Sequence, residues 1–100
     1  MFEKFRNNTQ NEDSPRFETR WKEELHCYYK KHHFVVEYTM GKSCTYFPEE
    51  AKWKENAPFK IRNDWAYLRD EAKKWSLRKE VGFHIDSTAW VYFDEDEYVK

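Results

Sequence analysis

The residues of this sequence best suited to chemistry lie together in one octapeptide, HCYYKKHH, at residues 26–33. It holds three of the four histidines and one of the two cysteines. Imidazole and thiolate groups are common zinc ligands, and recognisable zinc sites space them as Cys-x2-Cys or His-x3-His. Neither spacing occurs here, so a zinc site would need a long-range assembly such as Cys27, Cys44 and His84 with either His32 or His33. The sequence therefore predicts no metal and no cofactor.

The surrounding pattern predicts that this octapeptide ends a helix. Ser14 and Pro15 form a helix start, because serine is a good N-cap and proline suits the first helical position. The helix predicted over residues 15–31 carries an apolar stripe at three- and four-residue spacing, formed by Phe17, Trp21, Leu25 and Tyr28. Lysines and histidines at its carboxyl end suit the helix dipole. Those lysines would lower the pKa of Cys27, but no neighbouring base would make it a nucleophile.

Downstream, strand patterns alternate with helix patterns. β-branched and aromatic residues on both sides of a glycine turn predict a hairpin, and apolar residues at helical spacing predict an amphipathic helix. The predicted elements are, in order, a hairpin over 33–47, a short helical turn over 48–56, an extended segment over 58–61, a helix over 64–79 and a second hairpin over 83–93 around Asp86 and Ser87.

An acidic run at residues 94–97 could suggest a Ca²⁺ or Mg²⁺ site. It lacks the alternating aspartates and the glycine of a calcium loop. Asp94 and Glu97 instead have the spacing of a capping box, in which carboxylates satisfy the first N–H groups of a helix. This run is therefore predicted to begin a last helical turn without metal.

These elements predict one α+β domain over residues 14–100, preceded by a flexible arm at residues 1–13. An antiparallel sheet of two hairpins would carry two main helices on one face, in a two-layer arrangement resembling the ferredoxin-like fold. No segment is apolar enough to span a membrane, and the first residues lack the apolar core of a secretion signal. We therefore expect a cytoplasmic protein with reduced cysteines.

The composition favours a binding surface. Aromatic residues make up 20% of the chain and outnumber leucine, isoleucine and valine two to one, while the net charge is −1. So many rings exceed what a core of this size can bury, and surplus tyrosine and tryptophan are typical of protein interfaces. The near-neutral charge disfavours a general electrostatic DNA-binding protein.

The leading hypothesis is a non-enzymatic protein-binding module that inhibits or redirects a larger partner. Aromatic residues outside the periodic segments have no periodic reason to be buried, so they are the predicted anchors. The predicted partner-binding residues are Phe47, Trp53 and Tyr67.

Two alternatives remain beside this hypothesis. The first is a small nucleic-acid-binding protein that uses the helix over 64–79 and the residues just before it, with neighbouring rings for base stacking. Its predicted contacts are Lys60, Arg62, Arg69, Lys73 and Lys74. The second is a structural homodimer in which exposed rings pair with their own copies. No paired catalytic residues are apparent, so an enzyme is not expected.

The C-terminal sequence STAWVYFDEDEYV, in which an aromatic strand runs straight into an acidic helix start, resembles the endings of many small accessory proteins of tailed bacteriophages. The charged, aromatic-rich and glycine-poor character of the whole chain is similar to theirs. The resemblance carries no catalytic motif. It implies a phage accessory protein that binds a host protein.

Overall fold

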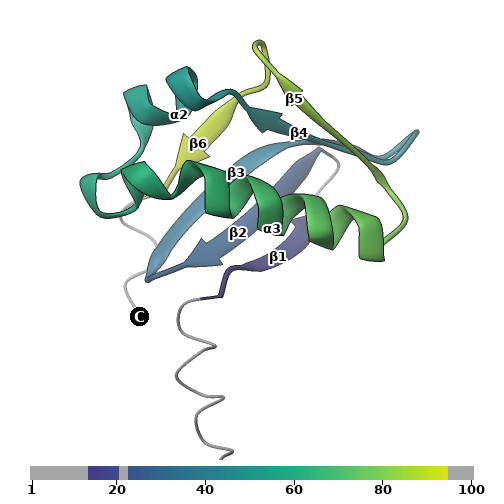
Figure 1. Ribbon diagram of the computed structural model, residues 1–100. Coiled ribbons are helices and arrows are strands. Elements are labelled where there is room, and N and C mark those ends of the chain that lie inside the picture. The colour runs from purple at the N-terminus through teal and green to yellow at the C-terminus, as the bar shows by residue number, and fades with distance from the viewer. Residues whose placement is uncertain (1–13, 21–22, 95–100) are drawn as a thin grey trace, which may run out of the picture.

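The structure, a computed structural model, describes residues 14–20 and 23–94 (Figure 1). The arm predicted at residues 1–13 and most of the capping box predicted at residues 94–97 lie outside this range. The elements are β1 Arg16–Arg20, β2 Glu24–Tyr29, β3 His32–Thr39, β4 Cys44–Pro48, α2 Glu50–Asn56, the 3-10 helix η1 Phe59–Asp64, α3 Trp65–Arg78, β5 Gly82–Asp86 and β6 Val91–Phe93.

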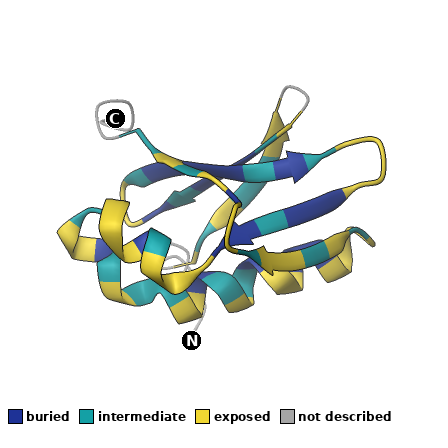
Figure 2. Ribbon diagram, turned by 90° about the horizontal axis from the view of Figure 1, so that it is seen from above, coloured by how far each residue is buried: buried dark blue, intermediate teal, exposed yellow. Residues whose placement is uncertain are grey.

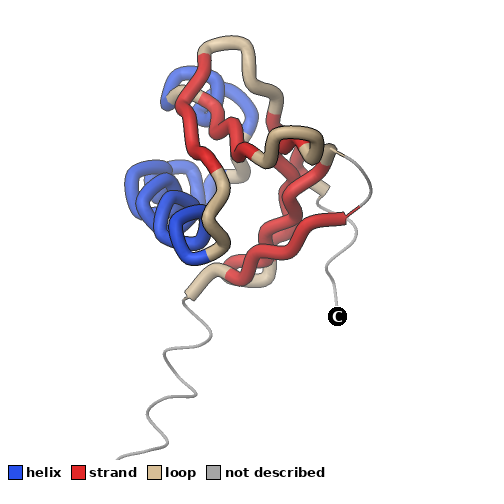
Figure 3. Tube along the Cα trace, turned by 90° about the vertical axis from the view of Figure 1, so that its right-hand side faces the viewer, coloured by secondary structure: helices blue, strands red, loops and turns tan. Residues whose placement is uncertain are grey.

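The six strands form one mixed sheet in the order β1-β2-β3-β4-β5. Strands β1 to β4 are antiparallel neighbours, whereas β5 runs parallel to β4. β6 pairs antiparallel with residues 34–36 of β3, and β4 pairs with residues 37–39 of the same strand. β3 therefore shares one side between two partners. The helices lie on one side of the sheet (Figure 3), which confirms the α+β class and the helices on one face.

The helix predicted over 15–31 was wrong, because this segment forms β1, β2 and the turn into β3. Leu25, Cys27 and Tyr29 point alternately into the core, with the two-residue period of a strand. Lys30 and Lys31 have φ angles of 47° and 64°, and this left-handed geometry suits a two-residue hairpin turn. The cationic cluster is thus a hairpin turn and not a helix end.

The second predicted hairpin, over 83–93, was also wrong. Its strands exist as β5 and β6, but β5 pairs with β4 and β6 pairs with β3. A turn at Asp86, whose Oδ1 accepts bonds of 2.9 Å from the N–H and the hydroxyl of Thr88, separates them. The sheet is therefore mixed and not antiparallel, and it lacks the ferredoxin-like strand arrangement.

The other predicted elements are mostly confirmed. β3 and β4 form the first hairpin, α2 is the short helix after Pro48, and α3 is the amphipathic helix. Residues 58–61 are not extended, because η1 begins at Phe59. Figure 2 shows buried and exposed residues alternating along α3, which packs its apolar side against the sheet. Neither α2 nor α3, the described α-helices, is long and apolar enough to cross a membrane.

The core lies between the sheet and the helices. Its fully buried members come from β2, β3, β4 and all three helices, and the largest are Trp53, Phe34, Phe47, Leu25, Ile61 and Leu68. An aromatic cluster around Trp53 joins α2 to β3, β4 and β6.

Candidate protein-binding face

Two of the three predicted anchors lie in the core. Phe47 and Trp53 have no exposed surface, so their predicted place at the protein surface was wrong. Phe47 points inward from β4, and Trp53 on α2 packs against it, with 6.2 Å between the centroids of the two rings. Tyr67 on α3 keeps 41% of its surface exposed, and its ring lies 5.9 Å from the ring of Tyr29.

The five predicted nucleic-acid contacts do not form one open basic track. Two of them line a shallow hollow beside β5 together with Asp70, namely Arg69 and Lys73. An Arg69 Nη2 lies 2.9 Å from Asp70, and Lys74 Nζ lies 3.3 Å from Glu71, so these charges are largely neutralised. Arg62 donates to the carbonyl oxygen of Ala57 through two nitrogens, at 3.2 and 3.1 Å. Lys60 and Lys73 are exposed.

The face of the sheet turned away from the helices is a second surface, called here the open face. Alternate residues of β2 and β3 enter the core, so those between them must point to the opposite side. Strand register then aligns the open-face residues into rows. These residues are Arg16, Glu18, Arg20, Glu24, His26, Tyr28, His33, Val35, Glu37, Tyr46, His84 and Tyr92.

Two histidines organise the middle of the open face. His26 Nδ1 lies 2.8 Å from His33 Nε2, so one nitrogen must donate and the other accept. Glu24 Oε1 lies 2.9 Å from His26 Nε2, and Asp94 Oδ2 lies 3.6 Å from His33 Nδ1. Both rings are nearly buried although helices cover only the other face. This chain of contacts holds the Glu24 carboxylate in place.

The described residues contain no group of three or more histidine, cysteine, aspartate or glutamate side chains arranged to hold a metal ion. The two cysteines are free and buried. Cys27 faces the core, and burial raises its pKa well above its usual 9.0, against a smaller lowering by Arg16. The lowered pKa expected from neighbouring lysines was therefore wrong.

Raising the pH above 9 should destabilise the protein through Cys27. The folded state keeps the thiol proton while the unfolded chain loses it, so stability falls with rising pH from the usual pKa of 9.0. The slope from this one group is at most about 1.4 kcal/mol per pH unit. Urea unfolding at pH 8, 9 and 10 should show a steeper decline for the natural chain than for Cys27→Ala. Equal slopes in both chains would contradict a protonated buried thiol.

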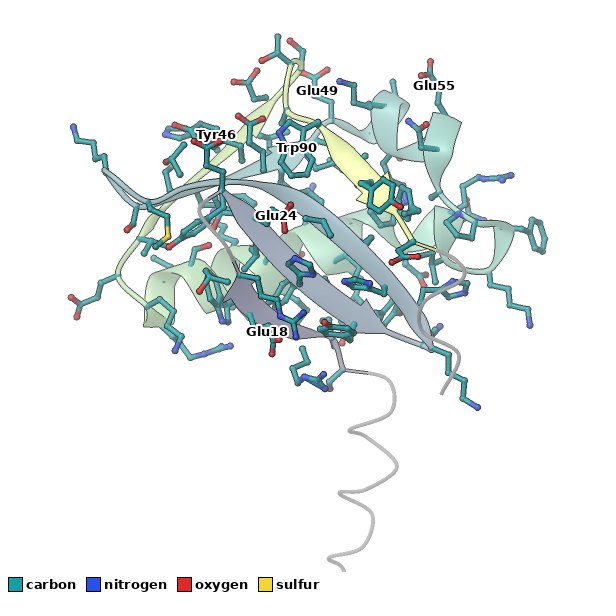
Figure 4. The ribbon with its side chains drawn as sticks, turned by 180° about the vertical axis from the view of Figure 1, so that it is seen from behind. Glu18, Glu24, Tyr46, Glu49, Glu55 and Trp90 are labelled. Carbon is teal, nitrogen blue, oxygen red and sulfur yellow. The ribbon has the colours of Figure 1, made fainter. Side chains whose placement is uncertain are left out.

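Large aromatic side chains are exposed at the β4 and β6 end of the open face. Trp90 is 38% exposed and Tyr92 is 59% exposed, and Tyr46 stacks on His84 with ring centroids 5.8 Å apart. Figure 4 looks onto this face and shows Trp90, Tyr46 and Glu24 on it. Exposed rings grouped on a sheet face without a covering layer are typical of a binding surface.

Comparison of the chain with protein-family models, curated proteins and solved structures found no match. The site must therefore be interpreted from its own geometry. Sequence reasoning missed the residues of the open face, since it had assigned β1 and β2 to a helix. The signal for them was the alternation of polar and apolar residues at 24–27, Glu-Leu-His-Cys.

Proposed function

We propose that this protein is a non-enzymatic binding module that holds a protein partner on its open face. The observation that carries the proposal is the exposure of Trp90 and Tyr92 on a sheet face that α2 and α3 leave uncovered. Tryptophan and tyrosine provide large contact area at small entropic cost, and they dominate the energy of many interfaces. The partner would be a host protein met in the bacterial cytoplasm, in keeping with the resemblance to phage accessory proteins.

Charge supports a protein partner over nucleic acid at this face. The carboxylates of Glu18, Glu24 and Glu37 lie on the open face, and Asp94 follows β6 at its edge. The opposing positive charges there are the two arginines of β1. A phosphate backbone would be repelled by this surface. The nucleic-acid alternative keeps the hollow that Arg69 and Lys73 line beside β5, at the edge of the sheet, where His84 also contributes.

We expect Trp90→Ala to weaken partner binding by about tenfold or more, and Trp90→Ala with Tyr92→Ala to weaken it further. The full chain serves as bait in host lysate with and without nuclease, and the captured protein is purified for affinity measurement by calorimetry. Thermal melting should show both variants folded, because each ring is partly exposed.

Tyr67→Ala is the matched control, since Tyr67 is a similarly exposed ring on α3. It should leave the affinity within about twofold. If Tyr67→Ala weakens binding and Trp90→Ala does not, the interface lies on the helical side. If nuclease removes every partner, the protein-binding function is wrong and the basic helix becomes the working site. Sedimentation of the isolated chain tests the homodimer alternative.

A further inference from the structure

The open face has a fork where β4 and β6 meet along the same side of β3. Glu37 is the Cα partner of Tyr46 in β4, and its neighbour Val36 is the partner of Val91 in β6. That side of Glu37 is thus taken by Tyr46, and Trp90 immediately precedes Val91 where β6 leaves β3. Glu37 therefore lies beside an aromatic residue on β4 and near another just before β6, and Figure 4 shows both rings on the same face.

The fork also carries a pair of like charges. Glu24 on β2 is the direct cross-strand partner of Glu37, and like charges at such positions destabilise a sheet. His26 contacts the Glu24 carboxylate at 2.9 Å. Within residues 14–20 and 23–94, no ion pair or hydrogen bond to the Glu37 side chain is found. A cation supplied by another molecule would therefore reduce the repulsion between the Glu24 and Glu37 carboxylates.

Strand pairing also places the Glu37 carboxylate close to the Tyr46 ring. The pKa of Tyr46 is raised, chiefly by Cys44, and the Glu37 carboxylate makes a smaller contribution in the same direction. A phenol ring beside a carboxylate is a favourable setting for a cation, since the ring face attracts positive charge.

Among the described residues, the two arginines of β1 already have partners. Arg20 Nε lies 3.1 Å from Glu18 Oε2, and the Arg16 guanidinium lies 4.5 Å from the centroid of the Tyr28 ring. Arg16 and Arg20 stand on β1, two strands away from Glu37 in the sheet order. Arg20 is the cross-strand partner of Glu24, but its Nε donates to Glu18. The fork thus keeps an anionic and aromatic character that complements a basic partner.

We propose that the fork receives an arginine side chain of the partner protein, with its guanidinium between Glu24 and Glu37 and its plane against Trp90 or Tyr46. This inference rests on the proposed function and names the chemistry of the partner. Arginine fits better than lysine, because a planar guanidinium donates to two carboxylates at once and stacks on an aromatic ring. A lysine ammonium is more strongly hydrated than a guanidinium, so removing its water at the same position costs more free energy.

The test uses a defined probe and does not depend on the natural partner. The ¹⁵N-labelled full chain is titrated with the peptide acetyl-Gly-Arg-Gly-Arg-Gly-amide at low salt, and amide and indole shifts are followed. We expect saturable shifts at Glu24, Glu37 and Tyr46 and at the Trp90 indole, with a dissociation constant on the order of 1 mM. The indole signal is assigned from its absence in Trp90→Phe.

Variants and matched peptides make the result specific. Glu37→Gln should weaken the peptide about threefold to fivefold, as expected for the loss of one ion pair. Glu55→Gln, which removes an exposed carboxylate on α2, should change nothing. The same peptide with citrulline in place of arginine should not bind, since citrulline has the shape of arginine without its charge.

Absence of saturable shifts at the fork, equal binding of the citrulline peptide, or unchanged affinity in Glu37→Gln would each overturn the arginine inference. The proposed function would survive these results if partner capture still depended on Trp90 and Tyr92. Conversely, if no protein partner is captured but the arginine peptide still binds, the proposed function is contradicted and the arginine inference is not. If sedimentation shows a dimer that Glu37→Gln dissociates, the occupant is a second copy and the inferred partner is wrong.

Discussion

Replacing Trp53 by alanine should destabilise the protein by about 3–5 kcal/mol, the usual range for removing a buried tryptophan. The side chain has no exposed surface, and its ring packs edge-on against Phe34 and Phe93 with centroid distances of 5.0 Å each. Its Nε1 donates to the carbonyl oxygen of Arg62 at 3.0 Å, so the substitution also leaves that acceptor without its partner. Small domains are stable by about 5–15 kcal/mol in total, so much of the stability would be lost.

Urea unfolding monitored by circular dichroism measures this effect, and Trp90→Ala is the matched control. Trp90 is 38% exposed, so its truncation should cost about 1 kcal/mol or less. A loss below about 1 kcal/mol for Trp53→Ala would contradict the packing around this ring. Weak partner binding by Trp53→Ala would therefore report unfolding, whereas weak binding by Trp90→Ala would report a lost contact.

Trp53 also shows what a single sequence reveals about burial. It stands in a short segment after Pro48 with too few turns for an amphipathic period to emerge, so its ring was expected outside. Burial arises because Trp53 packs against Phe34 of β3, Phe47 of β4 and Phe93 of β6, and this last ring comes from a distant part of the chain. The helix over 64–79 was predictable, because fourteen helical residues give its apolar face several repeats.

The misassigned segment over 15–31 has a physical explanation in its spacing. Phe17, Trp21 and Leu25 are four residues apart, and a spacing of four satisfies both the helical period and the strand period of two. The ambiguity is resolved only by pairing with β3, which buries Leu25 and Cys27 beside Phe34 and Val36. Such pairing depends on a turn at Lys30 and Lys31, where neither residue favours the left-handed geometry.

The open face could be predicted only in part for the same reason. Alternation at 24–27 was visible, but placing His26 and Glu37 on one side also requires the register of β2 with β3. The fork could not be predicted, since it requires β4 and β6 to share one side of β3. That arrangement follows from the parallel pairing of β5 with β4, which directs the chain after Asp86 back to β3.

The second large effect is expected at two buried hydroxyls that join α3 to β4. Ser76 Oγ donates to the carbonyl oxygen of Ala72 at 2.9 Å, and Thr45 Oγ1 lies 2.9 Å from Ser76 Oγ. Because the serine proton is given to Ala72, Thr45 must donate to Ser76. Neither residue has exposed surface, so water cannot replace a lost partner.

Ser76→Ala should therefore destabilise the protein by about 1–3 kcal/mol, because it leaves the Thr45 donor buried without an acceptor. Thr45→Val should cost less, about 1 kcal/mol, since Ser76 keeps its bond to Ala72. The double variant should be more stable than the sum of the two single losses predicts, as removing both hydroxyls leaves no orphaned group. A double-mutant cycle by urea unfolding measures the coupling.

Equal costs for the two single variants would contradict the assigned direction of the hydrogen bond. The same cycle bears on binding, because Thr45 immediately precedes Tyr46, one of the two rings at the fork. If Ser76→Ala loosens β4 against α3, the arginine peptide should bind more weakly although no contact residue has changed. If peptide affinity stays constant while stability falls, the fork is held by β3 and its pairing with β4, independently of the helical layer.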